Sequence, residues 1–395
     1  MIEVVGIGAT GWSSLGRAER DLVAAADLVV GSPRLLDLLP PVPGQRREPL
    51  PPNLRADLPT LLAEHQSGTT VVLASGDPLV AGIGATVVDL VSSGAVRIHP
   101  AVSSLALARA RMGWDADTVQ TVRLRTEDDV DLVRRWLFPG QRIVVLSRDA
   151  DSPSAVARLL AATGHGDSQI TVLSNLGAPD EARHSVDEVV PALNVVCVEV
   201  RGTDPYASLA PGLPDQAYEH DGQLTKRDIR ASALAHLMPR PGELLWDVGA
   251  GAGSIGIEWA RAHPRCRAVA VERDPDRAKR IAANAAALGV PGLTVVRGAA
   301  QHALADLPPP DAVFVGGGAD ERVLEVCWAA LRPGGRLVAH AVTLETEAAI
   351  TARWRERGGT LTRIALEHLE PIGGYHGWKP ARPVVQWSVT KAAAP

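Results

Sequence analysis

The sequence predicts an α/β protein of two domains, and three observations support this prediction. Before residue 202, short apolar runs alternate with helical patterns, as is typical of α/β folds. Further along, the apolar segment Leu244–Val248 runs into alternate glycines and then a second helical pattern. Between these two regions, residues 202–215 are rich in glycine and proline and lack periodicity, which indicates a linker. We therefore expect domains at residues 1–205 and 206–395, each large enough for its own core.

The N-terminal domain is expected to alternate buried strands with helices. Apolar runs predict strands at residues 2–7, 27–30, 70–74, 96–98, 143–146, 170–173 and 195–200. Helical patterns lie between them, for example at residues 17–26 and 155–162. An internal division is expected near Gly113-Trp114-Asp115.

A glycine pattern near the N-terminus is one that dinucleotide sites also contain. Residues 6–11, Gly-Ile-Gly-Ala-Thr-Gly, match the GxGxxG pattern. A dinucleotide site also needs an acid at the end of the second strand to bind the ribose. The expected strand at 27–30 is followed by Gly31 and Ser32 instead, so the sequence disfavours this interpretation.

The most informative turn lies in the C-terminal domain, at Asp247-Val248-Gly249-Ala250-Gly251-Ala252-Gly253. Its glycines leave the backbone bare at the start of a helix, where a nucleotide-like cofactor can approach closely. The next expected strand, 268–271, ends at Glu272, an acid placed to accept hydrogen bonds from a ribose. Asp247 puts a negative charge beside the glycines, which suits a sulfonium and an amino group better than a pyrophosphate. A dehydrogenase-type Rossmann unit is the alternative.

The later elements support the same interpretation. Residues 311–318 and 331–338 predict a fourth strand, a turn and a fifth strand, with a helix between them. This order resembles the class I S-adenosylmethionine-dependent methyltransferases. The resemblance implies that Glu272 holds the ribose and that the loop faces the methionine part of the cofactor, through Gly249, Ala250, Gly251, Ala252 and Gly253, beside Asp247.

Motifs in the N-terminal domain resemble another family, the tetrapyrrole methylases. They are Val-Val-Gly-Ile-Gly at 4–8, Ser-Gly-Asp-Pro-Leu-Val-Ala-Gly-Ile-Gly at 75–84, Pro-Ala-Val-Ser-Ser-Leu-Ala-Leu at 100–107 and Leu-Ser-Asn-Leu-Gly-Ala-Pro-Asp at 173–180. The resemblance implies two α/β lobes with S-adenosylmethionine in the cleft between them. The residues that would line this cofactor are Ser75, Gly76, Asp77, Val80, Ser103, Ser104 and Leu176. Taken alone, residues 76–78 would read as an ordinary turn that caps a helix.

The two halves in this order resemble the fused precorrin-6Y C(5,15)-methyltransferases (decarboxylating). Residues 212–230, here called the lead-in, resemble the segment that precedes the second domain of that family. Thr225, Ala299 and Ala300 match cofactor-binding positions of the family, although an acid often stands where this chain has Ala299. The sequence therefore predicts a tetrapyrrole methylase fold followed by a class I Rossmann-like methyltransferase domain, with one S-adenosylmethionine site in each.

The resemblance implies a bifunctional enzyme of cobalamin biosynthesis. It would methylate precorrin-6B at carbons 5 and 15 and remove the carbon-12 acetate carboxylate, giving precorrin-8. The alternatives are the cobalt-precorrin version of these steps, a domain kept as a non-catalytic module that binds an intermediate, and a methyltransferase that acts on RNA or protein.

Decarboxylation needs a proton relay, and candidate side chains gather in the lead-in and after the fifth strand. The candidates for the acid, or for groups that orient it, are Tyr218, His220, Arg227, Arg230 and His340. The alternatives are that Asp228 and Arg230 cap and decorate the helix expected at 226–238, and that His340 is a core residue. Glu258 is expected to be a structural partner, and His376 and Lys379 either cover the site or pack on it.

Composition limits the partners of the chain. A net charge of −5 disfavours nucleic acid, whereas the predominance of arginine over lysine suits a substrate with many carboxylates. The three cysteines are far apart, and neither they nor the histidines form a metal-binding pattern. No run approaches the length of a membrane span and no signal peptide is seen. We expect a cytoplasmic homo-oligomer that binds no metal.

Overall fold

The computed structural model describes residues 1–63, 68–91, 93–202 and 206–393. It divides into two compact units, one of residues 1–130 and 138–203 and the other of residues 131–137 and 204–395. The expected domain boundary at residue 205 lies outside the described residues.

The first lobe of the first unit is a parallel five-stranded sheet in the order β3-β2-β4-β1-β5. Its strands are β1 (Ile2–Ile7), β2 (Leu28–Gly31), β3 (Arg46–Pro49), β4 (Thr70–Ser75) and β5 (Val96–His99). Its helices are α1 (Arg17–Ala25), α2 (Pro33–Asp37), α3 (Leu54–Ala63) and α4 (Gly84–Val91). The strands β1, β2 and β4 are buried on both faces, which explains their nearly continuous apolar sequences.

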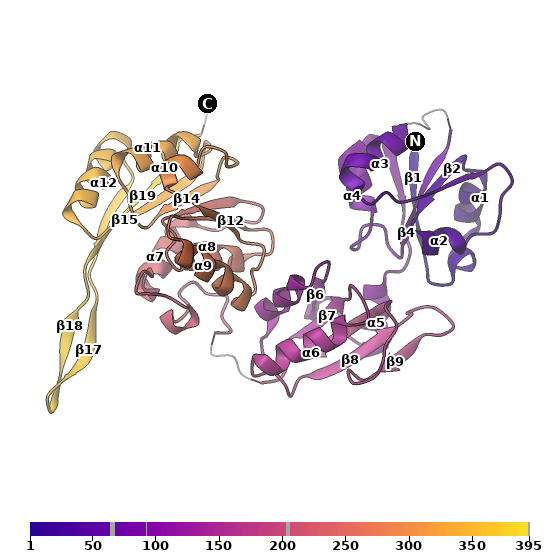
Figure 1. Ribbon diagram of the computed structural model, residues 1–395, viewed down its shortest axis with the longest axis horizontal. Helices are drawn as coiled ribbons and strands as arrows, with labels where there is room; N and C mark the ends of the chain where they lie inside the picture. Colours follow the sequence, from indigo (N-terminus) through magenta and orange to yellow (C-terminus); the bar gives the residue numbers. More distant parts are fainter. Residues whose placement is uncertain (64–67, 92, 203–205, 394–395) are drawn as a thin grey trace. The chain divides into compact units, whose positions relative to one another are not determined.

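The second lobe is a mixed sheet in the order β6-β7-β10-β8-β9 (Figure 1). Its strands are β6 (Val119–Arg123), β7 (Arg142–Leu146), β8 (Gln169–Ser174), β9 (Ala182–His184) and β10 (Asn194–Glu199), and its helices are α5 (Ser104–Met112) and α6 (Ser152–Ala162). Ala108 of α5 packs with Val144 and Cys197 of the second sheet. The expected division near residue 113 was therefore too late, because α5 already belongs to the second lobe.

The second unit is built on a seven-stranded sheet in the order β13-β12-β11-β14-β15-β19-β16. Its strands are β11 (Leu244–Val248), β12 (Arg267–Glu272), β13 (Thr294–Arg297), β14 (Ala312–Val315), β15 (Arg336–Ala341), β16 (Thr360–Ile364) and β19 (Val384–Thr390). Its helices are α7 (Arg227–Leu237), α8 (Ser254–Ala262), α9 (Pro275–Ala287), α10 (Ala300–Ala303), α11 (Glu321–Ala330) and α12 (Leu344–Arg357).

Helices cover both faces of this sheet. One apolar cluster joins α7, α8 and α9 to the sheet, and another joins α11 and α12 to the opposite face. The first five strands, from β13 to β15, run parallel, so their carboxyl ends meet at one edge. Ligands of open α/β sheets bind at such an edge.

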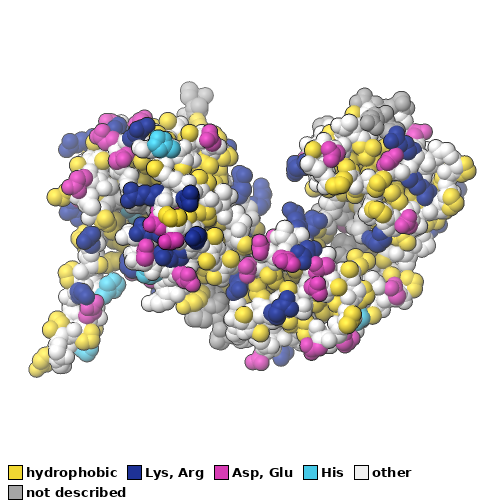
Figure 2. Space-filling model, viewed as in Figure 1, with side chains coloured by type: hydrophobic (Ala, Val, Ile, Leu, Met, Phe, Trp, Pro, Cys, Tyr) yellow, Lys and Arg dark blue, Asp and Glu magenta, His cyan; other side chains and the backbone are white. Residues whose placement is uncertain are grey.

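A two-stranded hairpin, β17 (Glu367–Ile372) and β18 (Tyr375–Pro380), extends from the second unit (Figure 1). Residues 372–378 include the tip of this hairpin and most of β18, which carries His376 and Lys379. Its apolar side chains are exposed, including Tyr375 at 82% and Trp378 at 67% (Figure 2).

The remaining short elements are 3₁₀ helices at Gly11–Ser14, Ser93–Ala95, Ala116–Thr118, Asp128–Trp136 and Asp215–Ala217. In the part of the chain that the structure describes, no helix has the length and apolar character needed to cross a membrane. Within the same residues, no group of three or more acids, histidines and cysteines could hold a metal ion.

Candidate functional site

The glycine turn after β11 has a backbone that few other residues could adopt. Gly249 and Gly251 have φ angles of +69° and +60°. A Cβ atom on Gly249 would lie 2.5 Å from the carbonyl oxygen of Gly317, and one on Gly251 would lie 2.7 Å from that of Gln223. Both close approach and a left-handed conformation therefore require glycine at these two positions.

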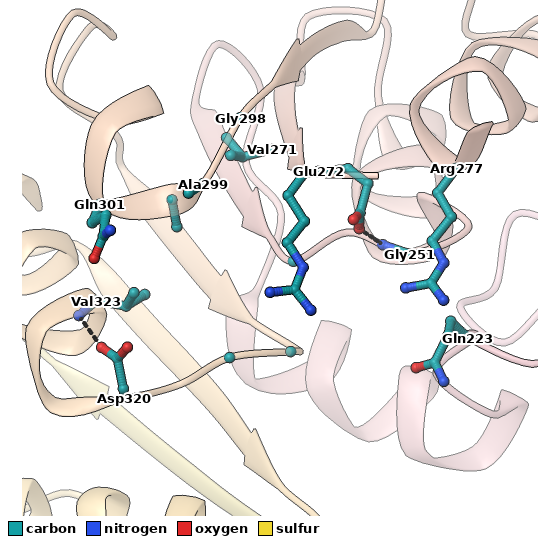
Figure 3. A pocket seen from close by; sticks show the side chains of 15 residues that line it. Gln223, Gly251, Val271, Glu272, Arg277, Gly298, Ala299, Gln301, Asp320 and Val323 are labelled. Atoms are coloured by element: carbon teal, nitrogen blue, oxygen red, sulfur yellow. Dashed lines mark hydrogen bonds between the residues drawn. The ribbon is translucent and has the colours of Figure 1, made fainter. Parts of the chain in front are cut away.

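A cavity of about 620 Å³ lies at this edge of the sheet (Figure 3). Among the residues expected to bind cofactor, the structure brings five to its wall: Gly249, Gly251, Glu272, Ala299 and Ala300. The wall also contains polar side chains that the sequence analysis did not select: Gln223, Arg273, Arg277, Gln301 and Asp320. Its size is in the range of pockets for small molecules and cofactors.

Glu272 ties the glycine turn to the next strand. It ends β12, and its Oε2 accepts a hydrogen bond of 2.9 Å from the Gly251 amide (Figure 3). Its Oε1 accepts a bond of 3.1 Å from the Asp274 amide. A carboxylate oxygen accepts more than one hydrogen bond, so Glu272 keeps the capacity to bind a ribose hydroxyl.

Asp247 lies beneath the turn and is not part of the cavity wall. Its Oδ2 accepts a hydrogen bond of 2.9 Å from the Gly256 amide, whereas its Oδ1 is buried without a hydrogen-bond partner among the described residues. Burial raises the pKa of Asp247 to about 7, and the negative charge of Glu272 adds to the rise. A cationic ligand above the turn would offset the cost of burying a negative charge on Asp247, so the residues fit a ligand with a sulfonium.

Two of the expected catalytic side chains, Tyr218 and Arg230, belong to a buried network centred on Glu258. The Glu258 carboxylate accepts hydrogen bonds from the Tyr218 hydroxyl (2.8 Å) and from Nε of Arg230 (2.6 Å). It also accepts bonds from the amides of Gly212 (2.6 Å) and Leu213 (3.0 Å). The network therefore fastens the start of the lead-in to α8.

Burial also limits the chemistry of this network. Arg230 is fully buried and also donates to the carbonyl oxygens of Leu213 and Thr225. Burial, and secondly the charge of Glu258, raises the pKa of Tyr218 well above its ordinary value. Neither side chain lines the cavity, so their geometry favours positioning of the lead-in over contact with reacting atoms.

The rest of the lead-in crosses the glycine turn. Asn284 of α9 accepts from the Glu219 amide (2.9 Å) and donates to the carbonyl oxygen of Ala252 (3.0 Å). Asp221 pairs with Arg277 at 2.8 Å, and its pKa is lowered to about 2, mainly by that hydrogen bond. These contacts hold Gln223 against Gly251, at the wall of the cavity.

Other expected residues lie elsewhere. His220 is exposed and accepts a hydrogen bond of 3.0 Å from the Gly222 amide. His340 lies in the core, where its Nε2 is 2.9 Å from Oε1 of Gln386, and burial lowers its pKa to about 4. His376 and Lys379 lie on β18 of the hairpin, where Lys379 pairs with Glu370 at 2.8 Å. The cavity wall contains none of these side chains, nor those of Ala250, Ala252, Gly253, Thr225 and Arg227.

The corresponding edge in the first unit is held by tight backbone contacts. A Cβ atom on Gly6 would lie 2.4 Å from the carbonyl oxygen of Gly76, and one on Gly76 would lie 3.3 Å from Cα of Ser103. The turns after β1, β4 and β5 therefore meet, which brings Ser75, Gly76, Asp77, Ser103 and Ser104 together.

Further contacts connect this edge to its surroundings. Asp77 accepts from the Leu79 amide at 2.8 Å, and its carbonyl accepts from the Val80 amide at 3.1 Å. Ser103 caps α5 by accepting from the Ala106 amide, and Arg34 donates to Oγ of Ser75 at 3.1 Å. Leu176 lies in the second lobe, packed with Ala108. Arg34 could not be identified from the sequence, because it lies on α2, outside the motifs that carry the family resemblance.

Two family models match the chain. The model described as tetrapyrrole (corrin/porphyrin) methylases matches residues 1–189, and the one described as precorrin methyltransferase domain matches residues 216–391. Among solved structures, the C-terminal domain of precorrin-6Y C5,15-methyltransferase from Rhodobacter capsulatus is 46% identical. The match covers 47% of this chain and 100% of that one, with a TM-score of 0.45.

Curated relatives extend over nearly the whole chain. A protein of Sinorhizobium sp named precorrin-6Y C(5,15)-methyltransferase [decarboxylating] is 45% identical over 99% of this chain and 96% of its own length. A protein of Mycobacterium tuberculosis with the same name is 43% identical over 99% of this chain and 100% of its own length. The chain therefore belongs to the precorrin-6Y C(5,15)-methyltransferase (decarboxylating) family. These are S-adenosylmethionine-dependent methyltransferases that methylate and decarboxylate a precorrin in cobalamin biosynthesis.

Proposed function

We propose that the two domains divide the reactions between them. The N-terminal domain, residues 1–205, methylates carbon 5 of precorrin-6B. The C-terminal domain, residues 206–395, methylates carbon 15 and decarboxylates the carbon-12 acetate, which gives precorrin-8. The observation that carries this proposal is the cavity at the edge of the second unit, bounded by the glycine turn and Glu272, in a chain that matches its family from end to end.

The names of shorter relatives support the assignment of two activities to one domain. A Salmonella typhimurium protein named cobalt-precorrin-6B C(15)-methyltransferase (decarboxylating) is 32% identical over 41% of this chain, which is 85% of its own length. The name of that relative therefore assigns both carbon-15 methylation and decarboxylation to a chain of that size. Residues 206–395 have a comparable length.

The metal-free precorrin is the proposed substrate, because the full-length relatives are named for it whereas the shorter ones are named for cobalt-precorrin. Arg273 and Arg277 on the cavity wall suit a macrocycle with many carboxylates. The cobalt form of the substrate is the alternative.

Each domain would hold one S-adenosylmethionine, which supplies an electrophilic methyl group. In the C-terminal domain Gly249, Gly251 and Glu272 bind it, and Asp247 compensates its positive charge. The Glu258 network, with Tyr218 and Arg230, keeps the lead-in closed over the turn. In the N-terminal domain the turns that carry Gly76, Asp77 and Ser103 form the corresponding surface. Alignment and exclusion of water are the main contributions of these residues.

The substitution Gly251→Arg tests the division of labour. It should abolish carbon-15 methylation and decarboxylation, because the side chain would enter the cavity and meet Gln223, while carbon-5 methylation continues. The measurement is mass spectrometry of the products formed from precorrin-6B and S-adenosylmethionine. The variant should give a product with one added methyl group and no loss of carbon dioxide. Gly292→Arg is the matched control, because a Cβ atom there would have no other atom within 4 Å. Loss of both methylations in Gly251→Arg alone would contradict independent domains.

We also propose that the protein is a cytoplasmic homo-oligomer, with a second copy of the chain covering the hairpin. Both outer edges of β17 and β18 are free to pair in the described structure, and Leu369 and Trp378 are exposed. The three free cysteines, all buried, suit a reducing compartment. Light scattering should show an oligomer that Leu369→Asp with Trp378→Asp converts to a monomer; an unchanged mass would contradict this interface.

A further inference from the structure

Gln301 is a polar side chain on the wall of the C-terminal cavity, and neither the turn nor the lead-in accounts for it. It is the second residue of α10, directly after Ala299 and Ala300, and it is half-buried. Figure 3 shows its amide directed toward the part of the cavity where Asp320 and Val323 lie.

The order of the strands indicates which part of the cofactor lies near Gln301. The glycine turn follows β11, Glu272 ends β12, and Gln301 comes after β13, which is the next strand of the sheet. All three groups line one cavity. A cofactor with its amino-acid part at the turn and its ribose at Glu272 therefore extends its adenine toward Gln301.

Adenine presents an amino group that donates a hydrogen bond and, beside it, a ring nitrogen that accepts one. The methyl side chain of Ala299 can do neither. A glutamine amide offers the complementary pair, an oxygen that accepts and a nitrogen that donates. Within the described residues no group bonds Oε1 of Gln301, and its Nε2 lies 3.2 Å from Nε2 of His302, which leaves one N–H free.

Asp320, the nearby carboxylate, can accept hydrogen bonds but cannot donate one to the adenine ring nitrogen. Its Oδ1 accepts a hydrogen bond of 2.8 Å from the Val323 amide, as the cap of α11. Resting on the cofactor site proposed above, we propose that Gln301 recognises the adenine edge, with Oε1 accepting from the 6-amino group and Nε2 donating to N1. This residue would give the C-terminal site its preference for an adenine nucleoside.

The test compares S-adenosylhomocysteine with its 6-deamino analogue, which has hydrogen in place of the amino group. Hydrogen-exchange titration of the full chain separates the two sites, because protection of peptides covering 249–256 reports the C-terminal site and protection of those covering 75–84 reports the N-terminal one. The natural protein should bind S-adenosylhomocysteine at the C-terminal site roughly three- to tenfold more tightly than the analogue, the value of one hydrogen bond. Gln301→Ala should bring that ratio close to one.

Gln223→Ala is the matched control, because Gln223 is the other glutamine of the same wall and contacts the turn instead of the base. Gln223→Ala should keep the affinity ratio of the natural protein. Ligand should protect the N-terminal peptides to the same extent in all variants. If Gln301→Ala shows abnormal hydrogen exchange without ligand, Gln301→Met replaces it, because methionine preserves the length of the side chain. Gln301→Met should also bring the ratio close to one.

Two results would overturn the assignment of Gln301: a ratio near one in the natural protein, or an unchanged ratio in both Gln301 variants. Absence of protection at 249–256 with either ligand would instead overturn the proposed cofactor site itself, and the assignment with it.

Discussion

The two edges proposed to bind cofactor in this chain are supported in different ways. In the first unit the support is backbone against backbone, since Gly6 packs on the carbonyl of Gly76. In the second unit buried ionisable side chains surround the turn, with Asp247 below it, Glu272 bonded to it and Glu258 fastening the lead-in. Both edges should therefore be sensitive to added side-chain volume, and the second should in addition be sensitive to changes of charge and pH.

The largest effect should come from Gly6→Val. The new side chain would overlap the carbonyl of Gly76 and also Ala101, 2.9 Å from the first added atom, so the turns after β1, β4 and β5 must separate. Carbon-5 methylation should fall about a hundredfold or more, as expected when a binding site is displaced by an ångström. Product masses measure this loss. Gly166→Val, with only an ordinary contact of 3.7 Å, is the control, and equal activity of both variants would refute the backbone account.

The next effect concerns charge in the second unit. Glu258→Ala leaves Arg230 buried without its main partner, which should lower the free energy of unfolding by about 3–5 kcal/mol. Arg111→Ala removes a more exposed pair with Glu181 in the first unit and should cost much less, because solvent screens an exposed ion pair. Denaturant titration followed by hydrogen exchange of peptides from each unit measures both. Similar costs would show that burial of the Glu258 network contributes little.

A smaller effect should depend on pH. The pKa of His340 is about 4 in the folded protein, below its ordinary value of 6.5, so the unfolded chain binds more protons between these values. Stability from this residue is present above pH 6.5 and decreases as the pH falls, by about 2 kcal/mol between pH 7 and 5. Asp247 has the opposite slope, so the measurement is the difference in unfolding free energy between the natural protein and His340→Gln. If the difference in unfolding free energy between the two proteins does not change with pH, the imidazole of His340 is not buried in its neutral form.

The smallest effect should appear in cofactor binding. With a pKa of about 7, Asp247 is mostly neutral at pH 6 and mostly charged at pH 8. S-adenosylmethionine carries a sulfonium charge that S-adenosylhomocysteine lacks, so the ratio of their affinities should increase a few-fold over this range. Binding at the C-terminal peptides measures it, with Asp247→Asn as the variant that should show no increase. The same increase in both proteins would assign the effect to another group.

Most strands could be predicted because they are buried on both faces and therefore apolar. Several of the missed strands are edge or exposed elements: β3 reads Arg-Arg-Glu-Pro, and the hairpin at 367–380 contains several charged residues. Their conformation depends on pairing with a neighbour and leaves no alternation in the sequence. The break between the lobes was misplaced for a related reason, since the packing partner of α5 is decided by tertiary structure.

The lining of the C-terminal cavity could be predicted where the backbone itself imposes a residue type. Gly249 and Gly251 need left-handed angles, and Glu272 ends a strand, so local sequence identifies them. Gln223 reaches the cavity only because the lead-in folds over the turn. Tyr218 and Arg230 resemble catalytic residues in type, and only the position of Glu258 on α8 reveals them as a buried network.

The lead-in has a practical consequence for dissecting the protein. A fragment that begins at the first strand of the seven-stranded sheet would retain every strand and every glycine of the turn. It would nevertheless expose the Glu258 carboxylate and Asn284, which form hydrogen bonds with the upstream segment in the intact chain. It would also lack the part of the cavity wall that Gln223 provides. The smallest autonomous version of this methyltransferase should therefore start some thirty residues before its Rossmann-like sheet, near Gly212.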